Sequence, residues 1–213
     1  MDGTLVDTEP YWMLAETELI GSFGGVWTHE DGLGVVGMGL WDAASIFQSR
    51  GVDLTADEII EWMTNRVLEQ VAVEVPWRPG ARELLADLKR ANIPTAMVTM
   101  SVHRMAATIA DSIGFPAFDV IVGGDDVEHP KPHPAPYLRA AELLGVDITD
   151  CVAIEDSVPG LASAVASGAV TIGIPLHSPL EQGETHTLWP SLDGKTLADI
   201  TRLFTERKRV PTL

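Results

Sequence analysis

Short apolar runs alternate with helical patterns over most of the chain. From residue 78 onward, four such runs stand between segments with helical spacing. They are Ala96–Val98, Val120–Val122, Val152–Ile154 and Val170–Ile174. Continuous apolar runs separated by helices are typical of parallel strands that are covered on both faces. The pattern therefore predicts an α/β fold built on a parallel sheet.

Two of the intervening segments carry clear helix signals. Residues 82–92 place Leu84, Leu85 and Leu88 on one face, and Pro79-Gly80 precedes them. Residues 137–144 show a second apolar stripe, which Gly145 ends. Glycine after the last periodic residue is a common helix terminator. We therefore expect helices over both segments.

Residues 12 to about 75 have a different pattern of apolar residues. Apolar residues recur with helical spacing over 41–47 and 59–67, and glycines separate the helical stretches. No run in this region resembles a buried strand. We expect an all-helical unit at 11–75, and an α/β unit formed by residues 1–10 together with 76–213.

Composition narrows the class of protein. The net charge of -17 argues against a nucleic-acid partner, because the phosphates would be repelled. The single cysteine, Cys151, excludes an internal disulfide and fits a reducing compartment. No apolar run approaches the ~18 residues of a membrane span. We expect a monomeric cytoplasmic protein that does not engage membranes, and a solvated tail at Glu206–Arg209.

Polar side chains follow the apolar runs where strands would end. Thr99 follows the first run, Lys131 follows the loop after the second, and Glu155 and Asp156 end the third. In open α/β sheets, ligands bind beyond the carboxyl ends of the strands. A hydroxyl, a lysine and an acid pair at one edge suit a phosphate ester held with a metal ion.

The N-terminal segment Asp2-Gly3-Thr4-Leu5-Val6-Asp7 resembles the first motif of the haloacid dehalogenase-like (HAD) hydrolases, Asp-x-Asp-Gly-Thr-Leu-Val-Asp. Thr99, Lys131-Pro132 and Glu155-Asp156 match the other three motifs in the family's order. The resemblance implies a Rossmann-like parallel-sheet core. It also implies that the helical segment is an inserted cap, as in the phosphoglycolate phosphatase and β-phosphoglucomutase branch.

The resemblance implies an Mg²⁺-dependent phosphatase that works through an aspartyl-phosphate. Asp2 would be the proton shuttle and would offer its carbonyl oxygen to the metal ion. Thr99, the backbone of Met100 and Lys131 would bind the phosphoryl oxygens. Asp156 would ligate Mg²⁺, with Glu155 either a second ligand or an outer group.

The family's nucleophilic Asp would stand one position before Met1. We expect that this residue and the first strand of the sheet precede Met1. A true start at Met1 would instead indicate a catalytically inactive homologue.

The substrate is expected to be a small phosphorylated metabolite, such as a sugar phosphate. A phosphomutase is the alternative enzyme. Between Thr8 and Val75 only Arg50 and Arg66 are basic, which disfavours the bisphosphate that a mutase usually needs. Tryptophans in the same stretch could stack on a sugar, although packing is the commoner use.

Overall fold

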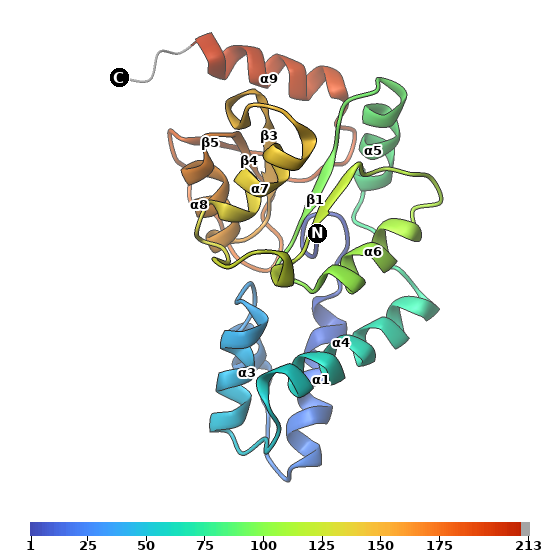
Figure 1. Ribbon diagram of the computed structural model, residues 1–213, viewed down its shortest axis with the longest axis vertical. Helices are drawn as coiled ribbons and strands as arrows, with labels where there is room; N and C mark the ends of the chain where they lie inside the picture. Colours follow the sequence, from blue (N-terminus) through green and yellow to red (C-terminus); the bar gives the residue numbers. More distant parts are fainter. Residues whose placement is uncertain (210–213) are drawn as a thin grey trace.

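A computed structural model describes residues 1–209, which form a helical lobe and an α/β lobe (Figure 1). The helical lobe contains α1 (Glu9–Ser22), α2 (His29–Leu33), α3 (Leu40–Ser49) and α4 (Ala56–Val73). Helix α4 packs against both α1 and α3. The two helical segments expected from periodicity lie within α3 and α4, so that prediction is confirmed. Within residues 1–209, no helix has the length and apolarity needed to cross a membrane.

The α/β lobe contains all four predicted strands. Its elements are α5 (Ala81–Arg90), β1 (Ala96–Val98), α6 (His103–Asp111), β2 (Val120–Val122), α7 (Ala135–Leu144), β3 (Val152–Glu155), α8 (Val158–Ser167), β4 (Val170–Gly173), β5 (His186–Leu188) and α9 (Leu197–Arg209). All the strand pairs are parallel. The chain therefore has the Rossmann-like parallel core and inserted helical cap that the sequence predicted.

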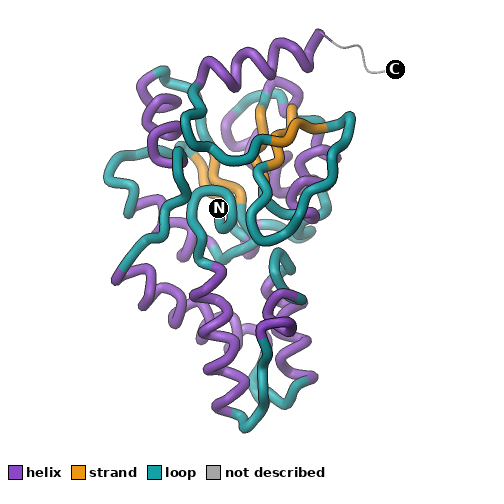
Figure 2. The backbone as a smooth tube through the Cα atoms, turned by 180° about the vertical axis from the view of Figure 1, so that it is seen from behind, coloured by secondary structure: helices purple, strands orange, loops and turns teal. Residues whose placement is uncertain are grey.

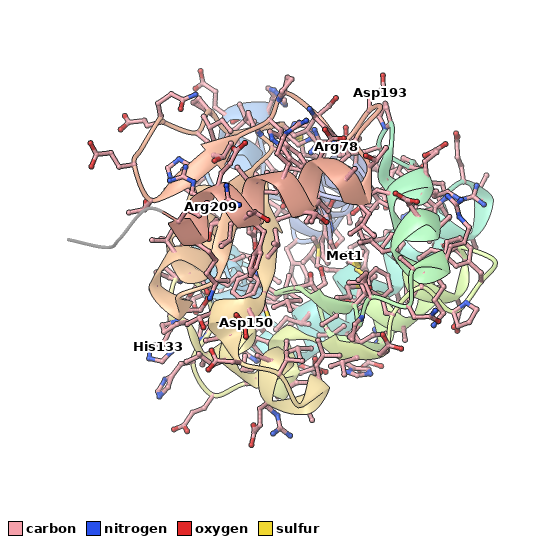
Figure 3. The ribbon with its side chains drawn as sticks, turned by 90° about the horizontal axis from the view of Figure 1, so that it is seen from above. Met1, Arg78, His133, Asp150, Asp193 and Arg209 are labelled. Atoms are coloured by element: carbon pink, nitrogen blue, oxygen red, sulfur yellow. The ribbon has the colours of Figure 1, made fainter. Side chains whose placement is uncertain are left out.

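The sheet is divided into two parts. Strand β1 pairs with β2, while β4 lies between β3 and β5. Between the two parts is a cavity of about 570 Å³, which is lined by apolar residues of β1, β3 and the surrounding helices. Met1 lines this cavity, and Figure 3 shows it near the middle of the α/β lobe. The facing edges of β1 and β3 have no strand partner among the described residues.

Helices cover the strands of both parts (Figure 2). Helix α7 packs on β1 and β2, α8 packs on β3 and β4, and α7 also contacts α8. Gly145 adopts a left-handed conformation (φ 69°) at the end of α7, as expected for a helix-ending glycine. Helix α5 packs against α9.

The expectation of a solvated tail at Glu206–Arg209 is only partly correct, because Glu206, Lys208 and Arg209 are exposed whereas Arg207 is half-buried. These residues form the last turn of α9, and Arg207 donates a hydrogen bond to Thr187 Oγ1 at 2.8 Å. The Arg207 guanidinium also donates to the backbone oxygens of Glu184 and His186. Arg207 therefore ties α9 to β5, a strand that the apolar pattern does not reveal because its residues are His-Thr-Leu.

The N-terminal turn is fixed to the α/β lobe. The Met1 carbonyl accepts a hydrogen bond from Leu5 N at 2.7 Å, so residues 1–6 form a tight turn. The buried Arg78 guanidinium donates to the carbonyls of Gly3 and Ile174. Arg78 comes directly after the helical lobe in the chain. Its contacts therefore connect the segment that follows this lobe to the N-terminal turn that precedes it.

Candidate active site

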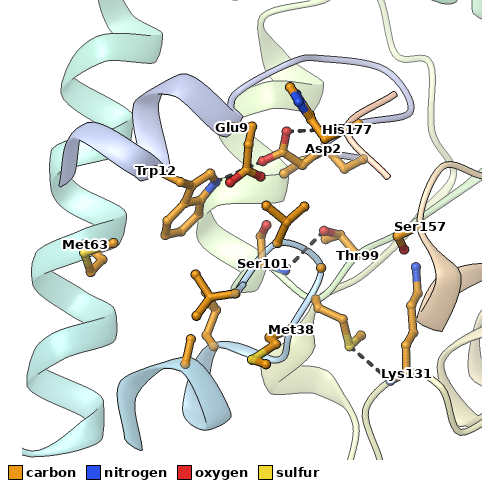
Figure 4. Close-up of a pocket in the computed structure, with 18 of the residues that line it drawn as sticks. Asp2, Glu9, Trp12, Met38, Met63, Thr99, Ser101, Lys131, Ser157 and His177 are labelled. Carbon is orange, nitrogen blue, oxygen red and sulfur yellow. Dashed lines mark hydrogen bonds between the residues drawn. The ribbon is translucent and has the colours of Figure 1, made fainter. Parts of the chain in front are cut away.

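A pocket lies where the carboxyl ends of the strands face the helical lobe (Figure 4). It encloses about 140 Å³. All the site residues predicted from sequence line it, namely Asp2, Thr99, Met100, Lys131, Glu155 and Asp156. We call the α/β side of the pocket, formed by these six residues, the core wall. The structure brings them together, whereas their chemical roles stay predictions.

Lys131 is held by a buried carboxylate. Its Nζ forms a salt bridge with Glu155 Oε1 and donates to the Val98 carbonyl at 3.2 Å. Tyr137 donates its hydroxyl to the same Glu155 oxygen. Burial, the largest single effect, opposes ionisation of Glu155, but the charges of Lys131 and the Met1 amine and the hydrogen bonds from Lys131 and Tyr137 together outweigh it. The pKa of Glu155 therefore lies below its usual value. The lysine therefore has a fixed position, with its counter-charge behind it.

Thr99 and Met100 follow β1. Thr99 is buried, and its Oγ1 accepts a hydrogen bond from Ser101 N at 3.2 Å. The Thr99 N–H donates to the Val122 carbonyl at 2.9 Å, which continues the pairing of β1 with β2. The Met100 sulfur accepts from Lys131 N at 3.3 Å, so these two loops contact each other.

Asp2 faces the first helix of the helical lobe. Its carboxylate accepts from Thr8 N at 2.9 Å, from Trp12 Nε1 at 2.9 Å and from the Thr8 hydroxyl. Burial raises the pKa of Asp2, although the Thr8 and Trp12 hydrogen bonds oppose this shift. A carboxyl with a raised pKa and fixed partners is suited to take up and release a proton.

Asp156 lies beside the N-terminal turn. It accepts from the Thr4 hydroxyl at 2.7 Å. Burial, and then the neighbouring Glu155, raise its pKa to about 6. A Cβ on Gly3 would lie 1.9 Å from Asp156 Oδ2, and Gly3 has φ 72°. Glycine is thus required at position 3 both for the turn and for the approach of Asp156.

The donor set at this edge fits a hard cation. Within residues 1–209, no group of three His, Cys, Asp or Glu side chains forms a complete metal cluster. The Asp156 carboxylate nevertheless lies at this edge, and its pKa is raised first by burial and then by the neighbouring Glu155, so it is short of a compensating positive charge. Oxygen donors of this kind are the ligands that Mg²⁺ prefers, and it usually keeps several waters.

Glu155 points away from such an ion. Its Oε1 faces Lys131 and Tyr137, and its Oε2 accepts from Asp156 N at 3.2 Å. A Cβ on Gly160 would also collide with this carboxylate, so the side chain is enclosed on that side. Of the two roles expected for Glu155, the geometry favours the outer one.

The helical lobe supplies the opposite side of the pocket, which we call the cap wall. It consists of Glu9, Trp12 and Glu16 on α1, the loop 35–38, and apolar residues of α3 and α4. The loop reaches the core, since a Cβ on Gly37 would lie 3.5 Å from Ser157 Cβ.

The two acids of the cap wall have raised pKa values. Burial, and then Asp2 and Glu16, raise the pKa of Glu9 to about 8. Burial raises the pKa of Glu16 to about 7, although a 2.9 Å hydrogen bond from Trp27 Nε1 opposes the shift.

Sequence reasoning missed several residues of the pocket. Glu9, Trp12 and Glu16 were not predicted as site residues, although spacings of three and four place them on one face of a helix. Tyr137 was read as part of an apolar stripe, and nothing in that stripe reveals its bond to Glu155. Thr4 belongs to the N-terminal motif, yet its partner Asp156 lies 152 positions away.

Comparison with known proteins identifies related chains. The haloacid dehalogenase-like hydrolase family matches residues 1–168. Hexitol phosphatase B of Escherichia coli (strain K12) is 28% identical over 94% of this chain and 91% of its own. Fructose-1-phosphate phosphatase YqaB of the same strain is 29% identical over 83% of this chain and 94% of its own. A CbbY mutant from Rhodobacter sphaeroides, solved with xylulose-(1,5)bisphosphate, superposes with a TM-score of 0.85. It is 29% identical, over 93% of this chain and 95% of that one.

Proposed function

Because the chain belongs to the haloacid dehalogenase-like hydrolases, and the two relatives described above are phosphatases, we propose that it is an Mg²⁺-dependent phosphatase. Its proposed substrate is a small sugar phosphate or a similar metabolite. The observation that carries the proposal is the convergence of Asp2, Thr99, Lys131 and Asp156 on one pocket. These residues supply a proton shuttle, a hydroxyl donor, a cation and a metal ligand, which is the set that phosphoryl transfer needs.

The proposed reaction has two steps. A carboxylate oxygen of the nucleophilic Asp attacks phosphorus, the bond to the leaving oxygen breaks, and Asp2 gives that oxygen its proton. Asp2 then takes a proton from water, which attacks the aspartyl-phosphate and releases inorganic phosphate. Lys131 and Thr99 hold the phosphoryl oxygens in both steps. Mg²⁺, held by Asp156 and the Asp2 carbonyl, would neutralise part of the charge on the phosphoryl group.

The nucleophile is proposed to precede Met1 directly, at the end of an apolar strand. Met1 lines both the pocket and the cavity between β1 and β3. A residue attached to Met1 would therefore enter the pocket, and the residues before it would fill the apolar cavity. Such a strand would also cover the exposed edges of β1 and β3.

We also propose that residues 1–10 and 76–213 form the core and that residues 11–75 form the cap. It is supported by the start of α1 at Glu9 and the end of α4 at Val73. A cytoplasmic location is proposed on the ground of the single free cysteine, and a monomer is proposed as the working form.

The test compares the 213-residue chain with a form in which five apolar residues and an Asp precede Met1. Both are assayed for phosphate release from p-nitrophenyl phosphate and a hexitol 6-phosphate, with Mg²⁺ and with excess chelator. We expect turnover by the extended form with Mg²⁺ alone. The shorter chain should show at most a small remnant, because positioning and charge stabilisation survive without the nucleophile.

The matched control carries Asn in place of the added Asp. It restores the strand without the nucleophile, so it should be folded but inactive. Equal turnover by the Asp and Asn forms would show that this residue is not the nucleophile. Full activity in chelator would remove the metal ion from the proposal.

A further inference from the structure

The two arginines of the cap are engaged away from the pocket. Arg50 forms a 2.7 Å salt bridge with Asp31 and lies over the ring of Trp27. Arg66 binds Glu18 and Glu69. Neither arginine lines the pocket, and residues 8–75 contain no lysine. The cap wall therefore presents no basic side chain to a substrate.

The rest of the pocket contains few side chains that can carry a positive charge. Of the pocket-lining side chains within residues 1–209, only Lys131 and His177 can carry a positive charge. Lys131 is paired with Glu155 and faces the proposed phosphoryl site. His177 Nε2 lies 2.6 Å from Asp7 Oδ1, so it already has an acidic partner. A second phosphate or a carboxylate on the substrate would lose its water without gaining a counter-charge, which is strongly unfavourable.

The cap wall does offer hydrogen-bond acceptors. Figure 4 shows Glu9 near Asp2, with Trp12 on the same helix. Within residues 1–209, no group donates a hydrogen bond to the Glu9 carboxyl, whereas Glu16 accepts from Trp27. A carboxyl oxygen accepts from a hydroxyl in either protonation state. The remaining cap lining is largely apolar, including Phe47, Ile60 and Met63. This surface suits a carbon chain that carries hydroxyl groups.

We infer that the substrate is a monophosphate whose remaining part is an uncharged polyol-like chain, and that Glu9 determines this specificity by accepting hydrogen bonds from its hydroxyl groups. The inference rests on the proposed function, and it selects among phosphate esters by the charge of the leaving group. Substrates with a carboxylate or a second phosphate are rejected because the pocket cannot compensate their charge.

Binding to the 213-residue chain tests the inference without requiring turnover. Calorimetry in Mg²⁺ measures dissociation constants for inorganic phosphate, a hexitol 6-phosphate, phosphoglycolate and fructose 1,6-bisphosphate. We expect the hexitol phosphate to bind about tenfold more tightly than the carboxylate and bisphosphate ligands, which corresponds to about 1.4 kcal/mol, or one to two hydrogen bonds to the Glu9 carboxyl.

Two glutamate variants locate the effect. Glu9→Leu removes both carboxyl oxygens with little change in volume and should remove most of the preference for the hexitol phosphate, while inorganic phosphate binds unchanged. Glu30→Leu makes the same change at an exposed acid of the same lobe and should alter none of the affinities. Circular dichroism checks that both variants fold.

The outcomes separate the two proposals. Failure of all four ligands to bind, inorganic phosphate included, counts against the phosphate site and hence the proposed function. Binding of phosphate together with equal or tighter binding of phosphoglycolate or the bisphosphate overturns the inference alone. An undiminished hexitol preference in Glu9→Leu overturns the role of Glu9.

Discussion

The two walls of the pocket differ in the charged groups that they hold. On the core wall, Lys131 is paired with Glu155, and the Asp156 carboxylate accepts from Thr4. On the cap wall, Glu9 is half-buried and Glu16 is buried, and both acids have raised pKa values and no basic partner within residues 1–209. The core wall thus holds charged groups in fixed positions, and the cap wall presents acceptors and apolar surface.

This difference suggests a division of labour. A phosphoryl group is the same in every phosphate ester, so the side that binds it can be rigid and densely bonded. The leaving group varies, and the side that faces it needs no more than shape and a few acceptors. Preorganised charge is the larger contribution to catalysis, so changes on the core wall should affect rate more than changes on the cap wall.

Lys131→Met gives the largest expected effect. The substitution keeps the length of the stem but removes the charge that faces the phosphoryl oxygens. In the extended form, kcat should fall about a thousandfold for every substrate, the loss typical of a transition-state donor. Lys89→Met, at an exposed lysine near Asp119, is the control and should keep full activity. A loss of less than about tenfold would remove Lys131 from the proposed machinery.

Asp156→Asn should weaken metal binding about a hundredfold, since even residues outside the ligand shell contribute ten- to a hundredfold. Titration with Mn²⁺, followed by electron paramagnetic resonance, measures this without any turnover. Glu155→Gln should have the smaller effect, because its carboxylate faces Lys131 rather than the ion. If Glu155→Gln weakens Mn²⁺ binding more than Asp156→Asn does, the assignment of the two acids is reversed.

Glu16→Gln tests the uncompensated acid of the cap wall through stability. The pKa of Glu16 is raised from 4.5 to about 7, so between these values the folded state keeps a proton that the unfolded state has lost. Stability of the parent should therefore fall as pH rises through this window, by up to about 3 kcal/mol.

Urea unfolding at pH 5 and pH 8 measures this difference. The glutamine variant should lose less stability between these pH values than the parent, and the exposed Glu30→Gln should behave like the parent. An unchanged pH dependence in Glu16→Gln would show that Glu16 ionises normally in the folded protein.

Tyr137→Phe, which removes a contact to Glu155 of the core wall, should have the smallest effect on kcat. It removes one donor to Glu155 but keeps the ring that lies 5.0 Å from Lys131 Nζ. The loss of one hydrogen bond, about 1 kcal/mol, predicts about a fivefold decrease in kcat with little change in KM. Wild-type kinetics in the variant would mean that Lys131 and Glu155 hold each other without the tyrosine.

The core wall could be predicted from sequence and the cap wall could not, for a physical reason. Strands end where apolar runs end, so Thr99, Lys131 and Asp156 could be located by reading the residues after each run. The parallel arrangement then places them at one edge. Strand β5 was not predicted from the sequence, because pairing with β4 and contacts from Arg207 stabilise it. Neither of these appears as local apolar periodicity.

The cap residues carry no equivalent local signal. Glu9 and Glu16 look like ordinary acids of an exposed helix until α1 is packed against α4 and faces the core. The bond between Tyr137 and Glu155 spans 18 positions and joins a helix to a strand end. Contacts of this kind depend on how elements pack, and a single sequence does not encode them as a pattern.

The most direct test measures kcat/KM for a hexitol 6-phosphate and for p-nitrophenyl phosphate in the extended form and its variants Lys131→Met and Glu9→Leu. The division of labour predicts that Lys131→Met lowers both values by the same large factor. It predicts that Glu9→Leu lowers only the value for the hexitol phosphate, because p-nitrophenol offers no hydroxyl chain to the cap wall. An equal loss on both substrates in Glu9→Leu, or a loss confined to one substrate in Lys131→Met, would contradict it.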